Sequence, residues 1–189
     1  MEPTVETLSV GLLGTCCYVL SLPERNDCVV IDPGAKPETV RQAVGRRDIA
    51  AILLTHGHFD HIGAVRELMG PATALVVHEL DAPLLGDPEL NASWLIRRRF
   101  TAPEATHLVR EGDEITYAGI TFTVLHTPGH TPGSVCYRVG GSLFSGDTVF
   151  HHGCGRTDLP GGSTDELRRS LARLEPLLAD VTLYPGHEA

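Results

Sequence analysis

Short apolar runs recur along most of the chain, and they predict a protein rich in β-strands. In several runs apolar and polar residues alternate, and in others Val, Ile and Leu follow one another without interruption. In the first half of the chain the runs cover residues 4–10, 17–22, 28–31, 50–55 and 74–78. In the second half they cover residues 114–117, 120–126, 134–139, 142–144 and 181–184. Gly119 and the pair Gly140-Gly141 lie between neighbouring runs and indicate hairpin turns.

Helical patterns are fewer, and we expect helices at residues 37–47, 63–69 and 164–178. The last of these is the clearest, because Ser163 and Glu166 have the spacing of a capping box at its start. Leucines three or four positions apart then form one apolar stripe, which we interpret as core: Leu167, Leu171, Leu174 and Leu178.

Residues 79–107 show no regular pattern, and we expect them to form a lid or an insertion over a site. The run Arg97-Arg98-Arg99 within this segment has two open interpretations. One is a solvated surface helix, and the other is a cluster of charge that steers an anionic ligand.

The order of these elements predicts an α/β protein with a single domain over residues 1–189. Many short strands, with helices at both ends of each half, favour two mixed β-sheets packed together and flanked by helices. This arrangement is a four-layer αββα sandwich. A chain of this length buries enough surface on folding to form a full core without disulfides or metals as staples.

Composition and charge narrow the range of partners. The formal net charge is −9, which disfavours nucleic acid because phosphate contacts need clustered Lys and Arg. No apolar run approaches the roughly 20 residues of a membrane span, and the N-terminus has no signal-peptide pattern. The five cysteines are an odd number and include no CxxC pair, which favours reduced thiols. We therefore expect a cytoplasmic protein that acts on a small molecule and does not bind a membrane, with its oligomeric state left open.

Histidines and aspartates follow several of the predicted strands, where turns leave the sheet. Four ligand-type residues lie within six positions after the run 50–55, namely His56, His58, Asp60 and His61. Buried together without a metal, they would carry large desolvation and repulsion costs. Comparable turns after other strands hold Asp32, His130, Asp147 and His187.

This set of side chains suits a pair of metal ions. Imidazole nitrogen and carboxylate oxygen are ligands for zinc, iron and manganese. Three histidines alone make a neutral site, whereas added carboxylates offset the repulsion between two cations and can bridge them. The sequence therefore predicts two divalent metal ions, with zinc as the first expectation and iron or manganese as alternatives.

The pattern His56-x-His58-x-Asp60-His61 resembles the signature of the metallo-β-lactamase superfamily, and later motifs follow in the order of that family. The resemblance implies the metallo-β-lactamase fold and a role for each residue. His56, His58 and His130 would bind the first metal, while Asp60, His61 and His187 would bind the second. Asp147 would bridge both ions, and Asp32 would orient a ligand of the first cluster. Asp60 and Asp147 are the expected catalytic carboxylates.

Further motifs are similar to the glyoxalase II-like branch, especially its short hydroxyacylglutathione hydrolase-like members with one domain. They are Gly14-Thr15-Cys16-Cys17-Tyr18, Gly146-Asp147-Thr148-Val149-Phe150 and Gly153-Cys154-Gly155-Arg156-Thr157-Asp158. The resemblance implies hydrolysis of a thioester or ester, with Arg156 as a candidate substrate contact.

The chain also departs from that branch. We expect no C-terminal helical domain of the kind with which full glyoxalase II helps to hold glutathione. Asp158 and Ala189 stand where the branch has aromatic residues. His187 lies two residues before the end of the sequence, so we expect this ligand to fray and the second metal site to be weakened. Relatives continue past this motif, so a fragment of a longer chain is an open alternative.

Two alternatives to a hydrolase stay open at this stage. Persulfide dioxygenases share the implied fold and the Gly-Cys-Gly-Arg-Thr-Asp pattern, and they would use a single iron bound by His56, His130 and Asp147. A non-enzymatic metal-binding module is disfavoured because a closed structural zinc site needs only four ligands.

Overall fold

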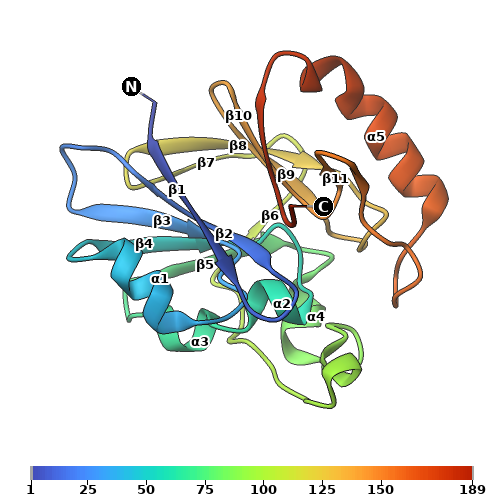
Figure 1. Ribbon diagram of the computed structural model, residues 1–189, viewed down its shortest axis with the longest axis horizontal. Helices are drawn as coiled ribbons and strands as arrows, with labels where there is room; N and C mark the ends of the chain where they lie inside the picture. Colours follow the sequence, from blue (N-terminus) through green and yellow to red (C-terminus); the bar gives the residue numbers. More distant parts are fainter. Residues whose placement is uncertain (1, 189) are drawn as a thin grey trace.

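Two large β-sheets lie face to face in the computed structural model of the protein, which describes residues 2–188 (Figure 1). Helices α1, α2 and α3 cover the outer side of one sheet, and α5 covers the outer side of the other. The predicted four-layer αββα sandwich is thus confirmed.

The first sheet has six strands in the order β1-β2-β3-β4-β5-β6. They are β1 (Thr4–Val10), β2 (Thr15–Ser21), β3 (Asp27–Ile31), β4 (Asp48–Leu53), β5 (Ala74–His78) and β6 (His107–Val109). Strands β1, β2 and β3 pair antiparallel, and β3, β4, β5 and β6 pair parallel. The sheet is therefore mixed, and its parallel strands end at one shared edge.

The second sheet has five strands in the order β13-β10-β9-β8-β7. They are β7 (Glu114–Tyr117), β8 (Ile120–His126), β9 (Val135–Val139), β10 (Ser142–Gly146) and β13 (Thr182–Pro185). Strands β10 and β13 are parallel, with Gly146 opposite Pro185. This register brings the turns that follow the two strands together. The short strands β11 (Val149–Phe150) and β12 (Gly153–Cys154) form a separate hairpin.

The core has three apolar layers. Between the sheets lie side chains of both, among them Leu20, Leu53, Phe122, Tyr137 and Phe144. A second layer joins the outer face of the first sheet to α1 (Pro37–Val44), α2 (Phe59–Ile62), α3 (Val65–Leu68) and α4 (Ala82–Gly86). A third layer packs α5 (Thr164–Leu178) on the second sheet through the leucine stripe.

Most predicted elements occur, with shifted ends. The helix expected at 37–47 stops at Val44, because Gly45 has a φ of 66° that leaves the helical region. The helix expected at 63–69 was wrong in its bounds, because helical turns begin at Phe59 inside the histidine motif and resume at Val65. The N-terminus of α5 is capped as predicted, with Ser163 Oγ accepting the Glu166 N–H at 3.3 Å.

The segment 79–107 contains α4 and η1 (Ser93–Ile96), a single 3₁₀ turn. The arginine run follows that turn and does not continue it as a helix, because Arg97 has a φ of 55°. Strand β6, at the end of this segment, and the β11–β12 hairpin were not predicted. No helix in residues 2–188 is long and apolar enough to cross a membrane.

Candidate metal centre

Four turns at the edges of the two sheets gather the predicted ligands. His56 and His58 follow β4, while Asp60 and His61 lie in α2. His130 lies in the loop after β8, Asp147 follows β10 and His187 follows β13. The turns converge because the parallel strands end at one edge and the sheets face each other.

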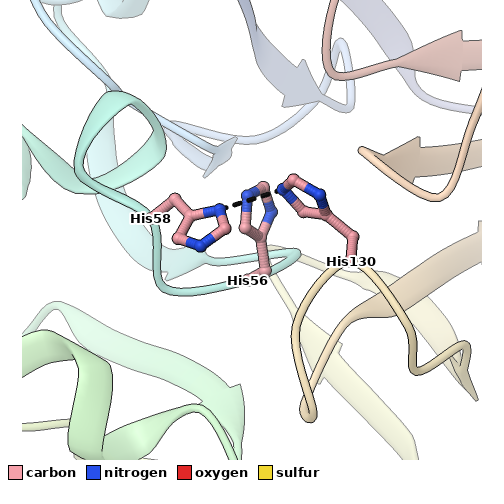
Figure 2. A group of neighbouring side chains, drawn as sticks. All are labelled: His56, His58 and His130. Atoms are coloured by element: carbon pink, nitrogen blue, oxygen red, sulfur yellow. Dashed lines mark hydrogen bonds between the residues drawn. The ribbon is translucent and has the colours of Figure 1, made fainter. Parts of the chain in front are cut away.

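His56, His58 and His130 form a first group, in which one ligand atom of each residue lies within 4.8 Å of the others. Figure 2 shows their three rings turned toward one another, with His58 Nδ1 at 2.9 Å from His130 Nε2. All three side chains are buried. His130 Nδ1 donates to the backbone carbonyl of Arg156 at 2.7 Å, so its Nε2 is an acceptor that faces His58 Nδ1.

Asp60, His61 and His187 form a second group with the same spacing limit. Asp60 Oδ2 lies 3.5 Å from His61 Nε2 and 3.3 Å from His187 Nε2, and it accepts the Thr15 hydroxyl at 3.0 Å. His187 is held in place, because its backbone bridges Thr15 and its Nδ1 donates to the Leu13 carbonyl at 3.1 Å. The fraying expected for this ligand is therefore not observed.

Asp147 lies between the two groups. Its Oδ2 is 3.4 Å from His130 Nε2 and 3.4 Å from His187 Nε2, while its Oδ1 is 3.4 Å from His61 Nε2. One carboxylate thus faces an imidazole of the first group and two of the second.

Asp32 lies behind these ligands and contacts two residues of the segment that carries the histidine motif, Thr55 and His61. Its Oδ2 accepts His61 Nδ1–H at 2.9 Å and the Thr55 hydroxyl at 2.5 Å, and its Oδ1 accepts the Thr55 N–H at 2.8 Å. Because the Thr55 hydroxyl donates to Asp32, its oxygen accepts from His56 Nδ1 at 3.1 Å. Both imidazoles are therefore oriented with Nε2 directed toward the other candidate ligands.

Four buried side-chain atoms in residues 2–188 have no hydrogen-bond partner: His56 Nε2, His58 Nε2, His61 Nε2 and Asp147 Oδ1. Buried polar atoms are almost always paired, because an unpaired one costs about 1–3 kcal/mol. All four belong to the two groups of candidate ligands. A bound cation would satisfy His56 Nε2, His61 Nε2 and Asp147 Oδ1, whereas His58 would bind it through Nδ1, the atom that faces His130. The donor set therefore fits a metal site.

The pKa shifts of the candidate ligands bear on metal binding. Burial, followed by the neighbouring imidazoles, lowers the pKa of His56 well below its usual value and lowers that of His58 to about 3. Burial raises the pKa of Asp147, but His61 and His187 outweigh it and hold that pKa well below its usual range. Neutral His56 and His58 and an ionised Asp147 are the forms that bind metal cations. Although burial opposes it, Asp60 and Asp147 raise the pKa of His61 well above its usual value and that of His187 to about 9, so these two imidazoles release a proton when a metal binds.

A pocket of about 490 Å³ lies over the two groups. Asp60, Asp147 and Arg156 line it, together with the apolar side chains of Leu13, Phe59, Leu95, Ile96, Phe150 and Leu159. Arg156 donates through Nε and Nη2 to both carboxylate oxygens of Asp158, at 2.6 and 2.7 Å. The candidate substrate contact thus borders the pocket, but its guanidinium is already paired.

Asp81 was not predicted as part of the site. Its buried carboxylate accepts N–H groups of Gly57 at 2.9 Å and Gly133 at 2.6 Å, and the Thr131 hydroxyl at 2.7 Å. It therefore ties the turn that carries His56 and His58 to the loop that carries His130. No local pattern around Asp81 signals this role, because its partners lie 24 to 52 residues away in sequence.

Two relatives of known name are similar over most of this chain. A hydroxyacylglutathione hydrolase of Aeromonas hydrophila is 38% identical over 174 residues, which cover 90% of this chain and 61% of that protein. A probable metallo-hydrolase, YqgX of Bacillus subtilis, is 38% identical over 187 residues, which cover 95% of this chain and 88% of that protein.

Solved structures show the same fold. The BLEG-1 B3 metallo-beta-lactamase has a TM-score of 0.92 at 36% identity, over 98% of this chain and 92% of that one. TTHA1623 in a di-iron-bound form has a TM-score of 0.84 at 36% identity, with coverage of 98% and 93%. ETHE1 from Myxococcus xanthus has a TM-score of 0.76 at 30% identity, with coverage of 98% and 76%.

A family model described as the metallo-beta-lactamase superfamily matches residues 10–187, which span every candidate ligand from Asp32 to His187. The match, the shared fold and the convergent metal-binding groups agree with the motif that the sequence contains. The chain belongs to the metallo-beta-lactamase superfamily.

Proposed function

We propose that this protein is a binuclear metal-dependent hydrolase that cleaves a thioester, such as a hydroxyacylglutathione-type substrate. The observation that carries the proposal is the position of Asp147 between two groups of three ligands, with its Oδ1 buried and unpaired. A carboxylate between two ligand groups is typical of two-metal hydrolases. The named relative from Aeromonas hydrophila supports the substrate class.

The residues divide between two divalent cations as the motif implies. His56, His58 and His130 would hold one, and Asp60, His61 and His187 would hold the other. Asp147 would contact both. Zinc is the first candidate for this mixed nitrogen and oxygen set, and iron or manganese are alternatives. The similarity to a di-iron-bound structure supports iron as a serious alternative.

When bound, the divalent ions supply Lewis acidity, which activates water near neutral pH and stabilises negative charge on a substrate carbonyl. Side chains of the protein position the water, accept its proton and exclude bulk solvent. The carboxylates of Asp60 and Asp147 border the pocket, where they can orient the attacking water and accept its proton. Apolar side chains such as Leu13, Ile96 and Phe150 exclude bulk water from the same space.

The chemistry of the leaving group favours a thioester. A thiolate has a conjugate-acid pKa of about 8.5 and departs without a strong general acid, whereas an amide nitrogen needs one. Outside the candidate ligands, the described residues that line the pocket are apolar, glycine or the paired Arg156. We also propose that the reaction takes place in the cytoplasm, because the five cysteines are free and four of them are buried.

The test is metal content and hydrolysis of S-lactoylglutathione by protein purified without chelator. The wild type is expected to hold two metal ions per chain and to hydrolyse the thioester. His58→Ala and Asp147→Ala should each lose metal and at least 100-fold in kcat/KM, since catalytic metal sites depend on their ligands. His152→Ala is a matched control, because this exposed histidine lies outside the ligand groups. Unchanged turnover in either ligand variant contradicts the proposal.

A mononuclear iron persulfide dioxygenase is the second candidate. His56, His130 and Asp147 form a compact set of two imidazoles and one carboxylate, with His130 Nε2 at 3.4 Å from Asp147 Oδ2. Such a set leaves positions on iron open for oxygen. One iron per chain and oxygen consumption with glutathione persulfide would establish this function and exclude the hydrolase.

A further inference from the structure

A second cavity, larger than the one over the metal centre, begins at Asp60 and runs away from the site. Its volume is about 850 Å³. The two cavities share four lining residues: Leu13, Phe59, Asp60 and Ile96. The two cavities therefore adjoin along these residues, with the candidate ligands at one end. Below, the cavity with the volume of about 850 Å³ is called the side groove.

The side groove is lined by four cationic side chains, those of Lys36, Arg66, Arg98 and Arg99. These come from separate segments, namely the residue before α1, helix α3 and the run after η1. The acidic residues in its lining are Asp60, a candidate metal ligand, and Glu67. Such a concentration of positive charge contrasts with a chain whose net charge is −9. It produces a local field that attracts anions.

Two of these cations have no ionic partner among residues 2–188. Neither Lys36 nor Arg98 forms an ion pair or a side-chain hydrogen bond there. Arg66 donates only to the backbone carbonyl of Thr101, at 3.2 Å. Arg99 is paired with Glu89 at 2.8 Å. Three cations thus keep their charge available, whereas the guanidinium of Arg156 over the metal centre is paired with Asp158.

The rims of the groove are apolar. Seven large apolar side chains are exposed in the described chain, and four of them line the two cavities: Leu12 lines the side groove, Leu95 lines the pocket over the metal centre, and Leu13 and Ile96 line both. Leu12 and Leu13 lie in the turn between β1 and β2, and the other two lie in η1. Exposed apolar side chains that lie together mark binding surfaces more often than a single one does, and Leu12, at 95% exposed, lies in the same turn as Leu13. An apolar segment of a ligand would cover these side chains.

We propose that the side groove binds the distal limb of the substrate, and that this limb has an apolar stretch ending in a phosphate or carboxylate. This inference rests on the proposed thioester hydrolysis, because the groove starts at the metal centre. The apolar stretch would lie between Leu12 and Ile96, and its anionic end would accept hydrogen bonds from Arg66 and Arg98. The anion is either on the thiol limb or on the acyl limb of the thioester.

Matched pairs of thioesters distinguish these two limbs. S-Acetylpantetheine and S-acetyl-4′-phosphopantetheine differ only by a phosphate on the thiol limb. S-Butanoylpantetheine and S-succinylpantetheine differ only by a carboxylate on the acyl limb. For one pair, the wild type is expected to favour the anionic member by roughly 10-fold in kcat/KM, since hydrogen bonds to charged groups are the strong ones. Equal kcat/KM values within both pairs overturn the inference.

Arginine variants test whether the preference for anionic thioesters arises in the side groove. Arg66→Ala and Arg98→Ala should each reduce the ratio of anionic to neutral kcat/KM by roughly 5-fold to 10-fold. Arg97→Ala is the matched control, because this exposed arginine is adjacent in sequence and does not line the groove. A preference that survives in both groove variants, or that falls equally in the control, places the anion elsewhere and overturns the inference.

A binding measurement separates this inference from the proposed function. Thioether analogues have a CH₂ in place of the carbonyl and cannot be hydrolysed, so they can be titrated into the metal-loaded protein whether or not it is a hydrolase. The pairs are S-ethylpantetheine with its 4′-phosphate, and S-butylpantetheine with S-(3-carboxypropyl)pantetheine. A tighter Kd for an anionic member, lost in Arg98→Ala, supports the groove even if no thioester is cleaved. Equal Kd values within both pairs reject it even if thioesters are cleaved.

Discussion

His61 donates its Nδ1–H to Oδ2 of Asp32 at 2.9 Å, and both side chains are buried. The same carboxylate accepts the hydroxyl and the N–H of Thr55, so it organises the loop that carries the first histidines. Asp32 also has a φ of 50°, a conformation that Asn adopts readily. Asp32→Asn therefore removes the negative charge and replaces one accepting oxygen by an NH₂ donor, without adding backbone strain.

We predict that Asp32→Asn weakens metal binding by roughly 10-fold to 100-fold, the usual effect of removing a carboxylate that orients a ligand imidazole. The amide NH₂ would face a donor of His61 or Thr55, which leaves that donor unpaired. Competition with a chromogenic chelator measures the affinity. Asp180→Asn, at a surface position, is the control and should bind metal like the wild type. Equal affinity in Asp32→Asn would show that Asp32 does not act through His61.

Metal removal should lower the stability of the protein. A ligand that binds only the folded state stabilises it by about 2.7 kcal/mol at 100 times its Kd. For a chain of this size that corresponds to roughly 5–10 °C in Tm. The physical reason is that His56 Nε2, His61 Nε2 and Asp147 Oδ1 are buried without partners and face the candidate metal sites. Thermal unfolding with and without chelator measures the shift, and Asp147→Ala should reduce it. A Tm that chelator leaves unchanged argues against bound metal.

The histidine motif and the β-strands could be predicted because their signals are local. His56, His58, Asp60 and His61 lie within six positions, and alternating or continuous apolar runs identify most strands of both sheets. Strand β6 was missed because it has only three residues and follows an irregular segment. The β11–β12 hairpin was missed because each of its strands has two residues.

Contacts between distant segments could not be predicted in the same way. Asp81 meets Gly57, Thr131 and Gly133 only after both sheets have formed, and its neighbours in sequence carry no motif. The arginine run was recognised as a candidate for steering anions. That Lys36 and Arg66 line the same groove depends on how α1 and α3 pack on the first sheet.

Gly34 lies against the helix that carries Asp60. A Cβ on residue 34 would lie 1.5 Å from the Asp60 carbonyl oxygen, and this oxygen cannot move without the backbone of α2. We predict that Gly34→Ala lowers the free energy of unfolding by about 3 kcal/mol or more and displaces Asp60 and His61. Gly86→Ala is the matched control, because its Cβ would meet nothing within 4 Å at the end of α4.

The control should be neutral or stabilising, by up to about 1 kcal/mol, since Ala favours helix over Gly. Urea denaturation of both variants measures the difference in the free energy of unfolding. If the two variants are equally stable, the close approach of Gly34 to α2 does not exist in solution.

Asp81 accepts three hydrogen bonds while fully buried, so replacing one of its oxygens should be costly. We predict that Asp81→Asn lowers the free energy of unfolding by about 2–4 kcal/mol, because the amide NH₂ would face a buried donor. Thr131→Val removes one donor with little change of shape and should cost about 1 kcal/mol. Urea denaturation compares the two. A smaller effect for Asp81→Asn than for Thr131→Val would contradict the proposed tie between the two loops.

His78 is a buried histidine outside the candidate metal centre. Its ring stacks on that of His126, with centroids 4.1 Å apart and planes inclined by 10°. Its Nδ1 accepts the Leu80 N–H at 3.2 Å. Burial, followed by the charge of His126, lowers the pKa of His78 to about 4, although the nearby Glu79 acts in the opposite direction. The folded protein therefore favours the neutral ring.

His78 should make the protein less stable in mild acid. In the unfolded chain its pKa is about 6.5, so below that pH the unfolded state binds a proton that the folded state does not. The stability that the neutral ring contributes is complete above pH 6.5 and is lost as the pH falls toward 4. Urea denaturation at a series of pH values measures the free energy of unfolding. As the pH falls from 6.5 to 4, this free energy should decrease more steeply in the wild type than in His78→Gln, whose side chain at position 78 cannot titrate. Candidate metal ligands titrate in both proteins, so only the difference between the two curves counts. Parallel curves between pH 6.5 and pH 4 would show that His78 titrates normally.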